Sequence, residues 1–94
     1  MGKDRVWLFE DLKRTKHACT LMKAEAALRA WKFTEGRSKG HARVWNYGHV
    51  TLTLHTPHGR SGKNMDPRAV AMVIRKIEEA AVLQLQEEEA NATD

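Results

Sequence analysis

One histidine stands among several cations, and this is the part of the sequence best suited to chemistry. His41 follows Arg37, Lys39 and Gly40 and precedes Arg43. Neighbouring positive charges favour the neutral imidazole, which can accept the proton of a ribose 2′-hydroxyl. The cations can stabilise negative charge on phosphate oxygens. The segment therefore fits either a histidine that cleaves RNA without a metal or a histidine that only binds phosphate.

Three more histidines follow within a short stretch, and their spacing raises the question of a metal. His55 and His58 are separated by two residues, as in some zinc sites. A zinc ion would need a third ligand such as His41 or His49, and residues 36–65 contain no carboxylate. We therefore expect no metal here and no other cofactor, and we interpret these histidines as polar residues on a solvated sheet face or as contacts to nucleic acid.

Aromatic and basic residues near this segment extend the candidate surface. On an open sheet Trp45 and Tyr47 could stack on bases, or the N-terminal segment could cover them and make Trp45 ordinary core. The residues expected to contact nucleic acid, besides His41, are Arg37, Lys39, Gly40, Arg43, Trp45, His55, His58, Arg60 and Lys63.

The charge of the chain is unevenly distributed. Residues 1–76 hold all 16 Lys and Arg against six acids, a net charge of +10, whereas residues 77–94 hold six acids and no Lys or Arg. A basic body of this kind favours a polyanionic partner, nucleic acid first. The alternative is a solvated basic surface without a partner. We expect the acidic tail to aid solubility or to shield the basic face.

Length and composition exclude several classes of protein. A chain of 94 residues forms one domain and is too short for a two-domain enzyme. No apolar run is long enough to span a bilayer, and no uncharged apolar stretch resembles a signal peptide. The single cysteine, Cys19, excludes a disulfide framework, so we expect a protein of the reducing cytoplasm without membrane contact.

The hydrophobic pattern predicts helices at both ends of a sheet. Asp4 can cap a short helix over residues 4–16, although a strand over residues 5–9 is an alternative. Thr20 can cap a helix from Leu21 to Trp31, whose apolar residues recur at helical spacing. Asp66 and Pro67 predict the start of a second long helix, in which an apolar stripe runs to residue 81 and the acidic end frays.

Three strands are predicted between these helices. They cover residues 33–35, 41–45 and 49–55, with a flexible basic loop over residues 36–40 and a turn over residues 46–48. Alternation places Val50, Leu52 and Leu54 on the buried face. In the second strand, Ala42 and Val44 suit the same face, which leaves His41, Arg43 and Trp45 on the open one.

These elements define the expected organisation. The sequence predicts a two-layer α+β domain of α-β-β-β-α order over residues 21–83. An N-terminal extension, residues 1–20, packs on or beside it, and an acidic tail, residues 84–94, is frayed or disordered.

The pattern resembles the HicA family of toxins over roughly residues 21–81. The matching features are Ala30-Trp31 at a helix end, the turn Arg37-Ser38-Lys39-Gly40-His41, the strand Val50-Thr51-Leu52-Thr53-Leu54, the loop Pro57-His58-Gly59 and the final helix. The resemblance implies a double-stranded-RNA-binding-like fold, metal-independent cleavage of mRNA with His41 as the catalytic residue, and a partner antitoxin that covers the basic face. Family members usually have a serine before this histidine, where the present chain has Gly40.

Two other functions fit the residues. The chain could bind RNA or DNA through the same fold without cleaving it, or it could bind another protein through its sheet face or its acidic tail. In the ribonuclease hypothesis, phosphates contact Arg37, Lys39 and Arg43 while His41 removes the 2′-hydroxyl proton.

Overall fold

The computed structural model describes residues 4–39, 42–55 and 64–92, and for residues 37–39 and 92 it describes the backbone alone. The elements follow in the order α1 (Arg5–Arg14), η1 (Lys16–Ala18), α2 (Leu21–Ala30), β1 (Thr34–Lys39), β2 (Ala42–Tyr47), β3 (Val50–His55) and α3 (Pro67–Ala92). The strands form one antiparallel sheet in the order β1-β2-β3. The predicted α+β fold with an α-β-β-β-α core is therefore confirmed.

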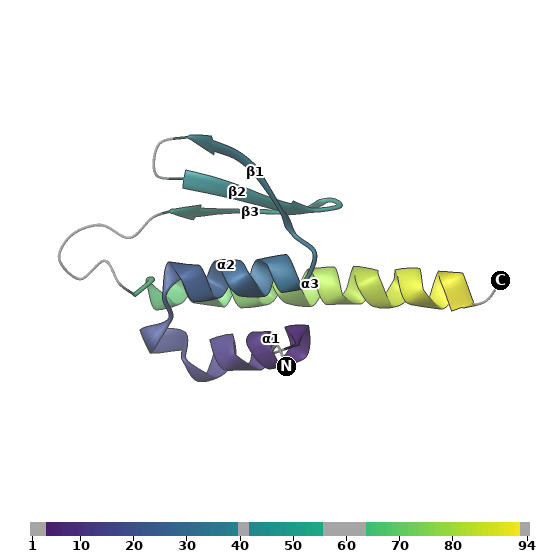
Figure 1. Ribbon diagram of the computed structural model, residues 1–94, viewed down its shortest axis with the longest axis horizontal. Coiled ribbons are helices and arrows are strands. Elements are labelled where there is room, and N and C mark those ends of the chain that lie inside the picture. Colours follow the sequence, from purple (N-terminus) through teal and green to yellow (C-terminus); the bar gives the residue numbers. More distant parts are fainter. Residues whose placement is uncertain (1–3, 40–41, 56–63, 93–94) are drawn as a thin grey trace.

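Three layers build the molecule (Figure 1). The sheet lies on one side of the pair formed by α2 and α3, and α1 lies on the opposite side of that pair. The N-terminal residues thus add a third layer behind the two that the sequence predicts. None of the described helices covers the other face of the sheet.

Side-chain caps explain where the helices begin. Asp4 accepts a hydrogen bond from the backbone nitrogen of Trp7, so residues 5–14 form the predicted helix and not the alternative strand. Thr20 caps α2 in the same way through the backbone nitrogen of Lys23. At α3, the Asp66 carboxylate accepts from the backbone nitrogen of Arg68 over 2.8 Å.

The core lies between the sheet and the helices, and it extends to α1. It is formed by side chains of all three layers, among them Leu12 from α1, Leu28 from α2, Trp45 and Leu52 from the sheet, and Ile77 from α3. Trp31, at the end of α2, is buried as the periodicity predicts.

The register of β2 against β3 corrects the predicted faces. Arg43 pairs with Leu54, Trp45 with Leu52 and Tyr47 with Val50. Directly opposed residues point to the same side of a sheet, so Arg43 and Trp45 lie on the helix-facing side and the prediction of an open position is wrong. The hairpin turn consists of Gly48 and His49 and not of residues 46–48, so the pairing of β2 with β3 differs from the expected one by an odd number of residues, which exchanges the faces. Gly48 adopts a left-handed φ of 57°, which glycine tolerates best.

The strand β1 is longer than predicted. It includes residues 36–39, which the sequence analysis assigned to a flexible loop, and its pairing with β2 is irregular between Glu35 and Ser38. A Cβ atom at Gly36 would lie 2.9 Å from Nδ2 of Asn46, so a larger residue here would require the Asn46 side chain to shift.

The helix α3 also continues further than expected, to Ala92, where the sequence predicted a frayed tail from residue 84. Its acidic end is held by other elements. Gln84 donates to the carbonyl oxygen of Trp31, the hydroxyl of Tyr47 donates to Glu87, and Arg5 forms an ion pair with Glu88. These contacts offset the unfavourable placement of glutamates at a helix C-terminus.

Candidate nucleic-acid interface

At one end of the sheet lie the described residues from which the two predicted basic segments continue. Lys39 pairs with Ala42, and Ala42 pairs with His55, so the three residues form one row across β1, β2 and β3. Residues 40–41 follow Lys39, and residues 56–63 follow His55. The helices α2 and α3 also begin at this end of the molecule (Figure 1). We call the row of Lys39, Ala42 and His55 the basic end of the sheet.

Several predicted site residues fall outside the described part of the chain. These are Gly40, His41, His58, Arg60 and Lys63, and only the backbone is described for Arg37 and Lys39. Of the remaining three candidates, His55 is exposed on the uncovered face of the sheet, whereas Arg43 and Trp45 face the helices.

Arg43 is paired with the carboxylate of Glu25, which is not among the predicted site residues. Its Nη1 atom lies 2.9 Å and 3.2 Å from the two carboxylate oxygens of Glu25 on α2. The Glu25 side chain is only 8% exposed, and that of Arg43 is 42% exposed. The ion pair therefore joins β2 to α2, and Arg43 would meet a phosphate with its charge already compensated.

A signal for Glu25 was present in the sequence. Leu21, Glu25 and Leu28 follow each other at intervals of four and three residues, so Glu25 lies on the apolar stripe of its helix. A carboxylate on a buried stripe requires a cation, because an unpaired buried charge is costly. The sequence did not identify that cation.

Trp45 cannot stack on bases in this structure. Its side chain is fully buried, and the guanidinium of Arg29 lies 5.1 Å from its ring centroid. The Nε1 atom of Trp45 is buried without a hydrogen-bond partner in the described part of the chain. The predicted base contact is therefore wrong, because the register places this residue between the sheet and α2 and not because α1 covers it.

Tyr47 connects α3 to the end of the sheet that lies opposite the basic end. Its ring packs against Phe33 at a centroid distance of 5.9 Å, and its hydroxyl donates to Glu87 over 3.0 Å. Burial, with this hydrogen bond and the charge of Glu87, raises the pKa of Tyr47 above its usual value. The contact gives the hydroxyl a structural role at the acidic end of α3.

The uncovered face of the sheet carries short polar side chains. Thr51 and Thr53 are exposed on it, and the hydroxyl of Thr51 donates to the side-chain oxygen of Asn46 over 3.0 Å. His55 is the only residue with a titratable side chain described on this face in β2 and β3. Positive charge on the sheet is therefore expected from the segments at its basic end, and not from the middle of its face.

A second buried carboxylate lies far from the sheet. Asp11 on α1 forms ion pairs with Lys23 at 2.7 Å and with Arg14. The hydrogen bond from Lys23 lowers the pKa of Asp11, against the opposing effect of burial, and Arg14 lowers it further. Nearby, burial raises the pKa of the Cys19 thiol, which makes this cysteine a poor nucleophile.

Within residues 4–39, 42–55 and 64–92, no three His, Cys, Asp or Glu side chains are grouped so that they could hold a metal ion. None of the described helices is long and apolar enough to cross a membrane. Comparisons with protein-family models, curated proteins and solved structures found no match to this chain.

Proposed function

We propose that this protein binds RNA at the basic end of the sheet and cleaves it without a metal, with His41 as the general base. The observation that carries the proposal is the row of Lys39, Ala42 and His55 within an α-β-β-β-α core. In the sequence, the segment that contains His41 directly follows Lys39, and the segment that contains His58, Arg60 and Lys63 directly follows His55, so both segments continue from residues of this row. The resemblance to HicA toxins implies the same order of elements and the same catalytic histidine.

The proposed reaction uses the RNA's own nucleophile. His41 takes the proton of a ribose 2′-hydroxyl, and the oxygen attacks the adjacent phosphorus. The bond to the 5′-oxygen breaks, that oxygen takes up a proton, and the products are a 2′,3′-cyclic phosphate and a 5′-hydroxyl. Arg37 and Lys39 stabilise the charge on the phosphate oxygens. DNA of the same sequence lacks the 2′-hydroxyl and stays intact.

The ion pair between Arg43 and Glu25 gives the proposal a structural basis. It fixes the start of β2, two residues after His41, against α2. Arg43 therefore acts mainly by positioning this strand, and its exposed part contributes a weaker phosphate contact. A partner antitoxin would bind over the same basic end and block access to His41.

The test is an incubation of the purified protein with mixed RNA in EDTA. We expect cleavage by the wild type, none by His41→Ala, and full cleavage by the control variant His49→Ala. His49 is an exposed histidine in the turn at the opposite end of β2 and β3. Cleavage that requires a divalent metal, or that cuts DNA equally, contradicts the proposed mechanism.

A gel-shift experiment in parallel separates binding from chemistry. RNA that is shifted but remains whole supports the alternative, a non-catalytic RNA-binding module. The compensated charge of Arg43 and the burial of Trp45 remove two of the predicted contacts, so RNA binding in either hypothesis depends on the residues at the basic end of the sheet. RNA that is neither shifted nor cut contradicts both, and it leaves a protein partner as the hypothesis.

A further inference from the structure

The outer side of α3 carries exposed residues at a regular spacing. Arg75, Glu78, Val82, Leu85 and Glu89 follow each other at alternating intervals of three and four residues, and all five are exposed. This is the spacing of a helix face that contacts another helix. The buried line of α3, from Val70 to Gln84, faces the core on the other side. Val82 is 55% exposed and Leu85 57% exposed, although both are aliphatic.

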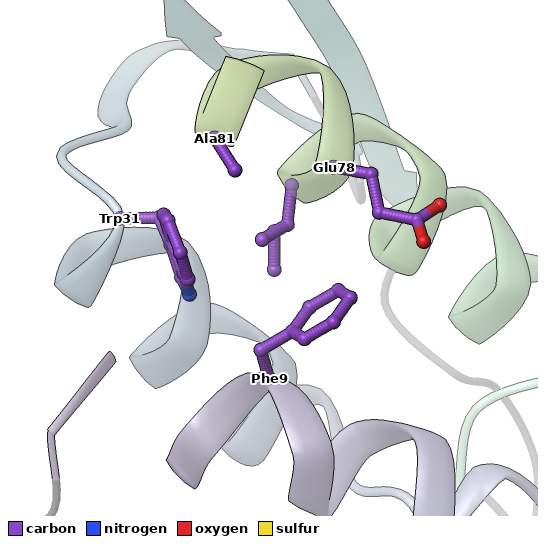
Figure 2. A pocket seen from close by; sticks show the side chains of 5 residues that line it. Phe9, Trp31, Glu78 and Ala81 are labelled. Atoms are coloured by element: carbon purple, nitrogen blue, oxygen red, sulfur yellow. The ribbon is translucent and has the colours of Figure 1, made fainter. Parts of the chain in front are cut away.

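A pocket opens beside this outer stripe (Figure 2). Its volume is about 160 Å³, and it is lined by Phe9 of α1, by Trp31, and by Ile77, Glu78 and Ala81 of α3. A cavity of about 150 Å³ can hold a group as large as benzene. The lining is apolar except for Glu78, which also belongs to the outer stripe, so the pocket suits an aliphatic side chain that reaches it across the stripe.

We propose that this surface binds a second copy of the same chain, with the two α3 helices antiparallel and Val82 close to the two-fold axis. In this arrangement Leu85 of each copy lies level with residue 79 of the other, beside the other copy's pocket. The pocket would accept the Leu85 side chain. An interface of this kind is self-complementary, as two-fold symmetric interfaces must be.

The charges on the outer stripe favour a second copy of this chain as the partner and an antiparallel arrangement of the two α3 helices. Arg75 and Glu89 each lie seven residues from Val82, so antiparallel pairing places Arg75 of one copy opposite Glu89 of the other, twice by symmetry. Parallel pairing would place Glu78 beside Glu78 and Glu89 beside Glu89, which is repulsive. Neither Arg75 nor Glu89 has an ion-pair partner among the described residues of its own chain.

The proposed dimer does not rest on RNA cleavage. Pro67 lies 15 residues before Val82, which corresponds to roughly 22 Å of helix. The N-termini of the two α3 helices would therefore lie about 45 Å apart, at opposite ends of the dimer. The basic end of each sheet stays clear of the interface, so dimerisation and RNA binding can be tested separately.

The first test is the oligomeric state of the full chain by analytical ultracentrifugation over a wide range of concentrations. We expect a reversible monomer–dimer equilibrium. Leu85→Asp abolishes the dimer while circular dichroism shows an intact helix, because Leu85 is exposed in the monomer. Met72→Asp, which adds the same charge at an exposed apolar position of α3 outside the outer stripe, leaves the dimer intact. A wild type that is monomeric at every concentration overturns the proposal.

Charge reversal tests the antiparallel direction. Arg75→Glu or Glu89→Arg alone creates two repulsive pairs, and we expect each to raise the dissociation constant about tenfold or more. Combining Arg75→Glu with Glu89→Arg restores affinity to within about threefold of the wild type. Failure of the double variant to recover overturns the proposed pairing, even where the wild type forms a dimer.

Cross-linking tests the position of the axis. With Cys19 replaced by alanine, Val82→Cys should form a disulfide between copies under mild oxidation, because the two positions meet near the axis. Met72→Cys, on the same helix and also exposed, should not. Equal cross-linking of both variants would overturn the assignment of Val82 to the axis.

Discussion

Two buried carboxylates show that many of the cations serve the fold. Asp11 is paired with Lys23 and Arg14, and Glu25 is paired with Arg43. More exposed pairs join Arg29 to Glu35 and Lys76 to Glu79. The net charge of the basic body therefore overstates the number of cations that are free to bind phosphate, and the residues at the basic end of the sheet matter more than the total.

Asp11 should make stability depend on pH in the acid range. The pKa of Asp11 is lowered in the folded protein, so its carboxylate contributes stability above its ordinary pKa of about 4. That contribution is lost as the pH falls through the lowered value. We expect Asp11→Asn to reduce the free energy of unfolding by about 1–2 kcal/mol at pH 7 and by much less at pH 2. Urea unfolding at both pH values checks this, with the exposed Glu10→Gln as control. An equal loss at both pH values would contradict the assignment.

Arg43 should matter to stability because its partner is buried. Arg43→Met leaves the Glu25 carboxylate without a cation, and we expect a loss of about 2–3 kcal/mol in the free energy of unfolding. Combining it with Glu25→Leu should cost less than Arg43→Met alone, since no unpaired charge remains. Thermal unfolding of the three variants, with the exposed Arg68→Met as control, measures this. A larger loss in the double variant would contradict the cost assigned to the unpaired Glu25 carboxylate.

At the scale of the elements, a single glutamine joins the three helices. The Gln84 side chain is buried, donates to the carbonyl oxygen of Trp31 over 2.7 Å and accepts from Arg5 over 2.6 Å. The indole nitrogen of Trp31 in turn donates to the carbonyl oxygen of Arg5 over 2.8 Å, and the Arg5 guanidinium lies over the Trp31 ring. These contacts connect α1, the end of α2 and α3 at one point.

Removal of this link should loosen α1 before the rest of the molecule. Gln84→Leu puts an apolar side chain at this buried position, leaves the Trp31 carbonyl oxygen without its donor, and leaves Arg5 with Glu88 as its only described side-chain acceptor. We expect a loss of about 1–3 kcal/mol in the free energy of unfolding. Hydrogen exchange should become faster in α1 than in the sheet. The exposed Gln86→Leu is the matched control, and uniform acceleration in every element would contradict a local role.

At the scale of the whole molecule, opposite charges lie at opposite ends. The molecule measures 53 × 28 × 24 Å, and α3 runs along its length with its acidic residues at the far end from the basic end of the sheet (Figure 1). From Pro67 to Glu87, α3 spans about 30 Å, whereas the Debye length at physiological ionic strength is about 8 Å. The acidic end is therefore too distant to shield the basic end within one chain.

Neutralisation of the acidic end tests this separation. Glu87→Gln, Glu88→Gln and Glu89→Gln together raise the formal net charge from +4 to +7. We expect RNA affinity at physiological salt to change by less than about twofold, because the charges are screened. Arg37→Ala with Lys39→Ala should weaken binding more and reduce its salt dependence. Filter binding at several salt concentrations measures both. A tightening of about tenfold or more in the triple variant would show that the acidic end does shield the RNA site.

The sequence by itself determined the elements of this protein. Caps at Asp4, Thr20 and Asp66 defined the starts of three helices, and the alternation of Val50, Leu52 and Leu54 identified the buried face of β3. These signals are local, because they depend on residues a few positions apart. The same is true of the uneven charge along the chain.

Only the tertiary structure decided which side chains meet. The register of β2 depends on the position of a turn, and a pairing that differs from the expected one by an odd number of residues puts Arg43 and Trp45 on the helix-facing side. The partners of Glu25 and Gln84 come from elements distant in sequence, which periodicity cannot identify. The acidic end of α3 is helical because Tyr47 and Arg5 lie beside it. The glutamates alone predicted a frayed end, because that prediction considered only residues close in sequence. Long-range contacts thus decided the roles of residues whose local conformation the sequence already indicated.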